Sequence, residues 1–234
     1  MACKNIICPG ATVFLLVFWL AAAPCAKPAG APPALPGDRH QEGGVMRVVF
    51  LGDSLTHRFA WSEALPGYVV LNFGIDGDTT LDVLARLSTV IAVKPDVVFL
   101  QIGINDYLGM DAWMGESPPS AGTMAAIVRN HGAIWRKLQK ALPRTKLYVC
   151  SLLPTAFPFD ADGRINAGIR EINAQLERSA REAGLPYIPL YSRFADAGGG
   201  LAKEFSRDGV HLSPAAYAVW LETIHPFLDS FRLP

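Results

Sequence analysis

Short apolar runs recur along most of the chain, separated by longer amphipathic segments. Five runs are rich in Val, Leu, Ile, Phe and Tyr and nearly free of charge: residues 47–51, 68–71, 96–102, 146–152 and 186–190. Continuous apolar runs of this length are typical of strands that are buried on both faces of a parallel sheet. We therefore predict five parallel strands.

Apolar residues recur at helical spacing between these runs. The spacing predicts helices over residues 79–93, 122–142, 165–183 and 214–224. Ser213 followed by Pro214 is a helix start, and Pro226 is expected to end that last helix. Alternation of strands and helices predicts a three-layer α/β/α domain, in which ligands bind beyond the carboxyl ends of the strands.

The N-terminal segment has a different composition. Residues 11–23 are uncharged and apolar, and Lys4 is the one charged residue before Lys27. The run is short for a membrane span but typical of the core of a signal peptide, so we predict a signal peptide over residues 1–26. The protein is then expected to be exported, either to a periplasm or out of the cell.

A retained N-terminal anchor is the alternative, and it would be the only contact with a membrane. Lipoprotein anchoring at Cys25 is disfavoured because Pro24 precedes the cysteine. Residues 27–45, rich in Pro, Ala and Gly, are expected to form a flexible linker. Residues 46–234 are then expected to form the folded domain.

Composition narrows the class of protein. Half of the residues are hydrophobic and 18% are charged, as in a globular protein, and 21 basic side chains balance 21 acidic ones. This balance gives no indication of a nucleic-acid partner. Once residues 1–26 are removed, Cys150 is the single cysteine, which excludes an intramolecular disulfide and a cysteine metal site. We expect no metal and no cofactor.

Polar residues follow the predicted strands at the edge where a ligand would bind. Gly52-Asp53-Ser54 follows the first strand, residues 72–80 with Gly77 follow the second, and residues 103–106 with Asn105 follow the third. Asp208 and His211 precede the last helix. Four loops with such residues at one edge indicate a catalytic site.

These residue types suit acyl transfer. A Ser hydroxyl is a weak nucleophile until a base accepts its proton, and among the five histidines only His211 has an acid three residues earlier within a short loop. His57 is the rival base, three residues after Ser54, but has no obvious orienting acid. The backbone N–H groups of Ser54 and Gly77 and the Asn105 amide could donate to an oxyanion. Taken singly, these residues have ordinary structural explanations: a helix N-cap for Ser54, a turn glycine, an Asx turn.

Together the four blocks resemble the signature blocks of the SGNH (GDSL-type) hydrolases. The resemblance covers nearly all of residues 46–234, in the family's order and approximate spacing, and implies that they are the catalytic domain. It implies a flavodoxin-like sheet, a serine esterase with Ser54 as nucleophile, His211 as base and Asp208 as its orienting partner. It also implies an oxyanion hole formed by Ser54, Gly77 and Asn105, and no metal.

The substrate is expected to be a small-molecule or carbohydrate ester with a short acyl group, and we predict that Asp53, Trp113 and Phe157 contact it. Trp113 and Phe157 belong to unusually apolar loops after the third and fourth strands. The alternatives are a lysophospholipase-type or thioesterase-type acylhydrolase, an acyltransferase, and a non-catalytic carbohydrate-binding module. The sequence leaves the acyl length, the alcohol and the oligomeric state open.

Overall fold

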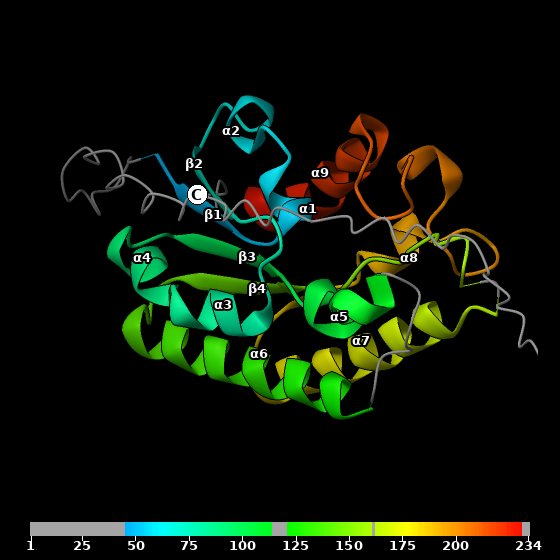
Figure 1. Cartoon of the computed structure of the whole chain (residues 1–234). Helices are drawn as coiled ribbons and strands as arrows, with labels where there is room; N and C mark the ends of the chain where they lie inside the picture. The colour runs from blue at the N-terminus through cyan, green and yellow to red at the C-terminus, as the bar shows by residue number, and fades with distance from the viewer. Residues whose placement is uncertain (1–44, 114–120, 161, 231–234) are drawn as a thin grey trace, which may run out of the picture. The chain divides into compact units, whose positions relative to one another are not determined.

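The computed structural model describes residues 45–113, 121–160 and 162–230 (Figure 1). The predicted signal peptide and nearly all of the predicted linker therefore lie outside the described residues. The five predicted strands form one parallel sheet in the order β2-β1-β3-β4-β5. They are β1 (Arg47–Gly52), β2 (Val69–Gly74), β3 (Val97–Gln101), β4 (Lys146–Cys150) and β5 (Tyr187–Ile188).

Helices connect the strands and complete the domain. They are α1 (Ser54–His57), α2 (Trp61–Ala64), α3 (Thr80–Ala85), α4 (Leu87–Ala92), α5 (Ile104–Trp113), α6 (Ala121–Ala141), α7 (Arg164–Glu182), α8 (Tyr191–Phe194), the 3₁₀ helix η1 (Lys203–Phe205) and α9 (Pro214–Asp229). None of the helices in the described ranges has the length and hydrophobicity of a membrane span.

Helices cover both faces of the sheet, which confirms the predicted three-layer fold. Helices α3, α4, α6 and α7 lie on one side of the strands, and α1, α2 and α9 lie on the other (Figure 1). The order 2-1-3-4-5 is that of flavodoxin-like sheets, whose switch point between β1 and β3 is the usual place for a ligand. The site is expected at the carboxyl ends of these two strands.

The face toward α9 is packed with aromatic rings. Phe50 of β1 stacks on Trp61 with ring centroids 3.8 Å apart, and on Phe99 of the neighbouring strand at 5.2 Å. Phe99 stacks in turn on Tyr148 of β4, at 5.1 Å. Trp220 of α9 is buried against Trp61. Rings of this size contribute much of the buried apolar area, so this layer fixes the strand ends that carry the site.

Three helix predictions need correction. The helix expected over residues 79–93 is divided into α3 and α4 at Arg86, whose side chain leaves the helix surface to bind polar groups near the strand ends. The loop after the third strand is a helix, α5, interrupted at Gly109. Helix α9 continues through Pro226 to Asp229, because Leu228 is fully buried in the core.

Candidate active site

The first strand delivers Ser54 to the carboxyl edge of the sheet. Strand β1 ends at Gly52, and Asp53 caps helix α1: its carboxylate Oδ1 accepts a hydrogen bond from the Leu55 N–H at 3.0 Å. Ser54 is therefore the first residue of α1, and the alternative in which it is the N-cap is wrong. Its hydroxyl is left to face the other loops.

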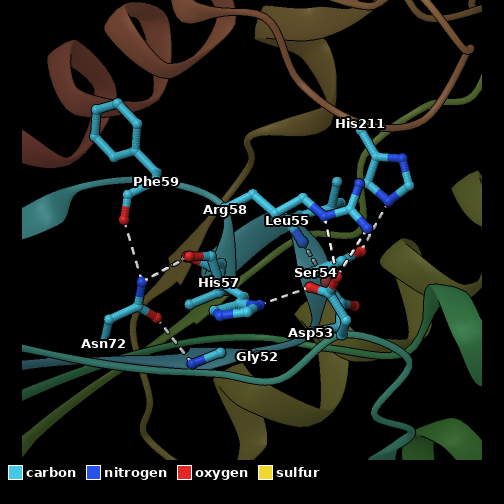
Figure 2. A network of polar contacts seen from close by, with 12 residues as sticks. Gly52, Asp53, Ser54, Leu55, His57, Arg58, Phe59, Asn72 and His211 are labelled. Carbon is cyan, nitrogen blue, oxygen red and sulfur yellow. Dashed lines mark hydrogen bonds and ion pairs between the residues drawn. The ribbon is translucent and has the colours of Figure 1, made fainter.

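Ser54, His211 and Asp208 form a continuous chain of hydrogen bonds. The Ser54 Oγ lies 3.1 Å from His211 Nε2 (Figure 2). The His211 Nδ1 lies 2.6 Å from Asp208 Oδ2. A base in contact with the hydroxyl and an acid in contact with the far ring nitrogen are the geometry of a serine-hydrolase triad. The structure thus brings together three residues that are up to 157 positions apart.

The loop that carries Asp208 is closely tied to its own backbone. Asp208 Oδ1 accepts hydrogen bonds from the N–H groups of Val210, at 3.0 Å, and His211, at 2.8 Å. Burial opposes ionisation of Asp208, but these bonds and the His211 ring outweigh it and hold the pKa of the carboxyl well below its ordinary value. These contacts favour the ionised form of the Asp208 carboxyl.

Gly209 permits this tight turn. Its φ is +85°, and an added Cβ would lie 2.6 Å from the carbonyl oxygen of Ala156. The Ala156 N–H donates to the Gly209 carbonyl at 2.8 Å. The segment that leads to Phe157 is thereby joined to the loop of His211.

Two further loops bring the predicted oxyanion donors to the same edge. Gly77 lies between β2 and α3 with φ +83°, a left-handed conformation that favours glycine. Asn105 is the second residue of α5, directly beyond β3. The Asn105 Nδ2 donates to the Asp78 carbonyl at 2.9 Å and so joins the two loops.

The sequence model of the GDSL-like Lipase/Acylhydrolase family matches residues 50–219, which is most of the chain. The chain belongs to this family. It is a carboxylic ester hydrolase with the GDSL/SGNH fold.

Relatives of this GDSL-family hydrolase are 27–28% identical to it over the aligned residues. The platelet-activating factor acetylhydrolase IB subunit alpha1 of Rattus norvegicus is 28% identical over 192 residues, which cover 77% of this chain and 74% of the relative. The alpha2 subunit of Gallus gallus is 27% identical over 193 residues, covering 77% and 75%.

Solved structures agree on the fold. A GDSL-like lipase from Bacteroides thetaiotaomicron superposes with a TM-score of 0.63 at 23% identity, covering 79% of this chain and 88% of that one. An acetylxylan esterase from Geobacillus stearothermophilus gives a TM-score of 0.61 at 21% identity, covering 77% and 94%. At these identities the likeness establishes the fold alone.

The three residues predicted to contact substrate differ in their exposure to solvent or lie outside the described residues of this GDSL-family hydrolase. Asp53 has no exposed surface, so it is a helix cap under the site and the prediction that it contacts substrate is wrong. Phe157 is half-buried and stacks on the exposed ring of Phe159, with centroids 4.8 Å apart. The side chain of Trp113 lies outside the described part of the structure.

The rival histidine, His57, pairs with an acid from another loop. Its Nδ1 lies 2.8 Å from Asp76, so the expectation that His57 has no acid beside it is wrong, because that acid arrives from the next loop of the fold. His131 is fully buried in α6 and pairs through Nε2 with the Ile102 carbonyl at 3.0 Å. Only His211 among the described histidines contacts Ser54.

The residues that hold the loop between β2 and α3 (residues 75–79, called the oxyanion loop below) were not predicted from the sequence. Arg86 Nε binds the Asp78 carboxylate at 2.6 Å, and its Nη2 donates to the carbonyls of Gly52, at 3.1 Å, and Phe73, at 2.8 Å. Asp106 accepts from both the N–H and the hydroxyl of Thr80. The sequence feature that could have indicated these contacts is the set of acids that follow the strands: Asp76, Asp78 and Asp106.

The cysteine of the described residues is buried within the sheet. Cys150 is buried in β4 as predicted, and burial raises the pKa of its thiol. In the described ranges, no group of three His, Cys, Asp or Glu side chains is arranged to hold a metal ion.

Proposed function

We propose that the chain cleaves esters with Ser54 as nucleophile, His211 as general base and Asp208 as the residue that orients the imidazole. The observation that carries this proposal is the hydrogen-bonded chain from Ser54 Oγ through both ring nitrogens of His211 to Asp208. An ionised Asp208 fixes the tautomer that presents an unprotonated Nε2 to the hydroxyl.

The reaction then runs in two halves. His211 Nε2 takes the Ser54 proton as Oγ attacks the ester carbonyl carbon, and a tetrahedral oxyanion forms. The N–H groups of Ser54 and Gly77 and the second N–H of the Asn105 amide stabilise that oxyanion. The intermediate collapses as His211 protonates the departing alcohol, leaving an acyl group on Ser54. Water, deprotonated by the same base, releases the acid.

Hydrolysis is favoured over acyl transfer because the site is open to water. The side chains of His211 and Asp208 are 27% and 55% exposed, whereas a transferase must keep water from the acyl-enzyme. A non-catalytic carbohydrate-binding module is disfavoured because every chemical position of the triad is filled.

We propose a short acyl group, acetyl to butyryl, as the preferred substrate. The relatives named above are acetylhydrolase subunits, and one of the structural neighbours is an acetylxylan esterase. The stacked pair Phe157–Phe159 fits the alcohol side, where an aryl or sugar ring could stack for about 0.5–1.5 kcal/mol. A contact of Trp113 with the same group stays a prediction.

The test is a panel of acetyl, butyryl and decanoyl esters of one phenol, run on the wild type, Ser54→Ala and His211→Ala. We expect kcat/KM to fall from acetyl to decanoyl, and each variant to lose several orders of magnitude in kcat while keeping its melting temperature. A serine-directed phosphonate should label the wild type but not Ser54→Ala. Near-normal turnover by Ser54→Ala would refute the mechanism; a decanoyl preference would refute only the substrate assignment.

Export is also proposed, on the apolar run of residues 11–23 and the small residues that follow it. Mass spectrometry of the mature protein from its native host should show an N-terminus near residue 27. An intact N-terminus would favour a retained anchor or an unprocessed chain.

A further inference from the structure

One carboxylate joins the oxyanion loop to the helix of the nucleophile. Asp76 Oδ1 lies 2.8 Å from His57 Nδ1, and its Oδ2 accepts from Arg58 Nε at 3.1 Å and from Arg58 Nη2 at 2.8 Å. Asp76 directly precedes Gly77, and His57 and Arg58 lie at the end of the short helix that Ser54 begins. The contact therefore joins two loops that carry different parts of the candidate site.

We propose that Asp76 is a positioning residue, which holds the Gly77 N–H in register with Ser54 through its contacts with Arg58 and His57. This inference rests on the proposed function, in which Gly77 donates to the oxyanion. Asp76 touches no reacting atom in this scheme and acts only through the peptide that follows it.

Packing alone leaves the Gly77 peptide poorly held. An added Cβ at Gly77 would meet no heavy atom within 4 Å, and the Ile75 side chain is nearly half exposed. On the far side, the loop is secured at Asp78 by Arg86 and Asn105. The Asp76 contacts, together with the Ile75 N–H that donates to the Gly52 carbonyl at 3.1 Å, secure the near side, so the peptide between the two aspartates is held from both ends.

Arg58 extends this link toward the triad. The hydrogen bond to Asp76 raises the pKa of the Arg58 guanidinium above its ordinary value, and the charge of Asp208 adds to the effect. Figure 2 shows the Arg58 side chain reaching from α1 toward His211. The positive charge of Arg58 therefore interacts with Asp76 of the oxyanion loop and with Asp208 of the triad.

The exposure of these side chains to solvent limits how much kcat should fall when the Asp76 contacts are broken. The side chains of His57, Arg58 and Asp76 are 57%, 47% and 44% exposed, so the ion pair is screened by salt. We therefore expect a moderate loss on breaking it, about fivefold to twentyfold in kcat, well below the roughly 10²–10³-fold loss for a deleted oxyanion donor.

The test is Asp76→Asn, which keeps the side-chain shape and removes the charge. The expected result is that fall in kcat for an acetyl ester, with KM changed by less than about threefold. The affinity of a trifluoromethyl ketone, whose adduct places an oxyanion on the same donors, should fall by the same factor as kcat. Added salt should lower kcat of the wild type and leave Asp76→Asn unchanged. Arg58→Lys should lose less than Arg58→Ala.

Glu222→Gln is the matched control. It breaks the exposed pair between Arg193 and Glu222, whose atoms lie 3.2 Å apart, and should leave kcat and inhibitor affinity unchanged. Wild-type kcat in Asp76→Asn, or a change in KM alone, would overturn the positioning role while Ser54→Ala remains inactive. Activity retained by Ser54→Ala would instead overturn the proposed function and this inference with it.

Discussion

The side-chain amide of Asn105 is expected to serve two partners at once. One N–H holds the Asp78 carbonyl at 2.9 Å, which leaves the other to meet a developing oxyanion. Asn105→Ala should therefore lower kcat by about 10²–10³-fold, as loss of an oxyanion donor does elsewhere. Steady-state kinetics on an acetyl ester, with a melting curve for each protein, measures this. A loss confined to KM would place Asn105 in substrate binding instead.

Asp208 gives a second prediction about a single residue. Asp208→Asn keeps the size of the side chain but removes the charge that selects the His211 tautomer. We expect kcat to fall by about 10⁴-fold at pH 8, as it does when a triad aspartate becomes an amide elsewhere. The replacement of Asp196, another exposed loop aspartate that hydrogen-bonds only to nearby backbone N–H groups, by Asn is the control and should leave kcat unchanged. Comparable kcat values for the two variants would remove Asp208 from the mechanism.

At the level of elements, Arg86 explains why the helix after β2 is broken. Its guanidinium reaches the Asp78 carboxylate and the carbonyls of Gly52 and Phe73 from the position between α3 and α4. Both side chains of the pair are largely buried, at 17% and 11% exposure. Removing one partner of such a pair leaves the other charge without compensation.

Arg86→Ala should therefore destabilise the fold strongly. We expect a loss of about 3–5 kcal/mol in the free energy of unfolding at pH 8. The loss should be smaller at pH 5, because burial raises the pKa of Asp78 and the unpaired carboxyl can take up a proton. Arg164→Ala, at an exposed pair with Asp162, should cost about 0–1 kcal/mol in urea unfolding at either pH. Equal losses in the two variants would contradict this account.

Features that depend on residues close in the sequence could be predicted, and features that depend on contacts between distant loops could not. The strands follow from unbroken apolar runs, and Asp208 and His211 are local neighbours in one loop. The Asp76–His57 contact and the break at Arg86 could not be predicted, since both depend on which loops the sheet order brings together. Asp53 was misassigned because a cap under the site and a ligand contact share the same position in the sequence.

For the whole domain, two buried groups make opposite contributions to the pH dependence of the free energy of unfolding. Burial raises the pKa of Asp53 to about 7, while burial lowers the pKa of His131 to about 4. Between pH 4 and 7 the folded state holds the Asp53 proton that the unfolded state has released, so this group lowers stability as pH rises. His131 stays neutral in the folded state while the unfolded state binds a proton, so it raises stability with pH up to about 6.5.

Single variants should separate the two contributions. Asp53→Asn keeps an oxygen that can accept from the Leu55 N–H but cannot ionise, so its stability relative to the wild type should rise by a few kcal/mol between pH 4.5 and pH 8. His131→Asn should show the opposite trend, losing relative stability as pH rises from 4.5 to 6.5, whatever the constant cost of the smaller side chain. Urea unfolding at four pH values across this range measures both slopes. Parallel curves for the wild type and Asp53→Asn would mean that the buried carboxyl keeps an ordinary pKa. The Asp53 side chain beneath the site would then be charged at neutral pH.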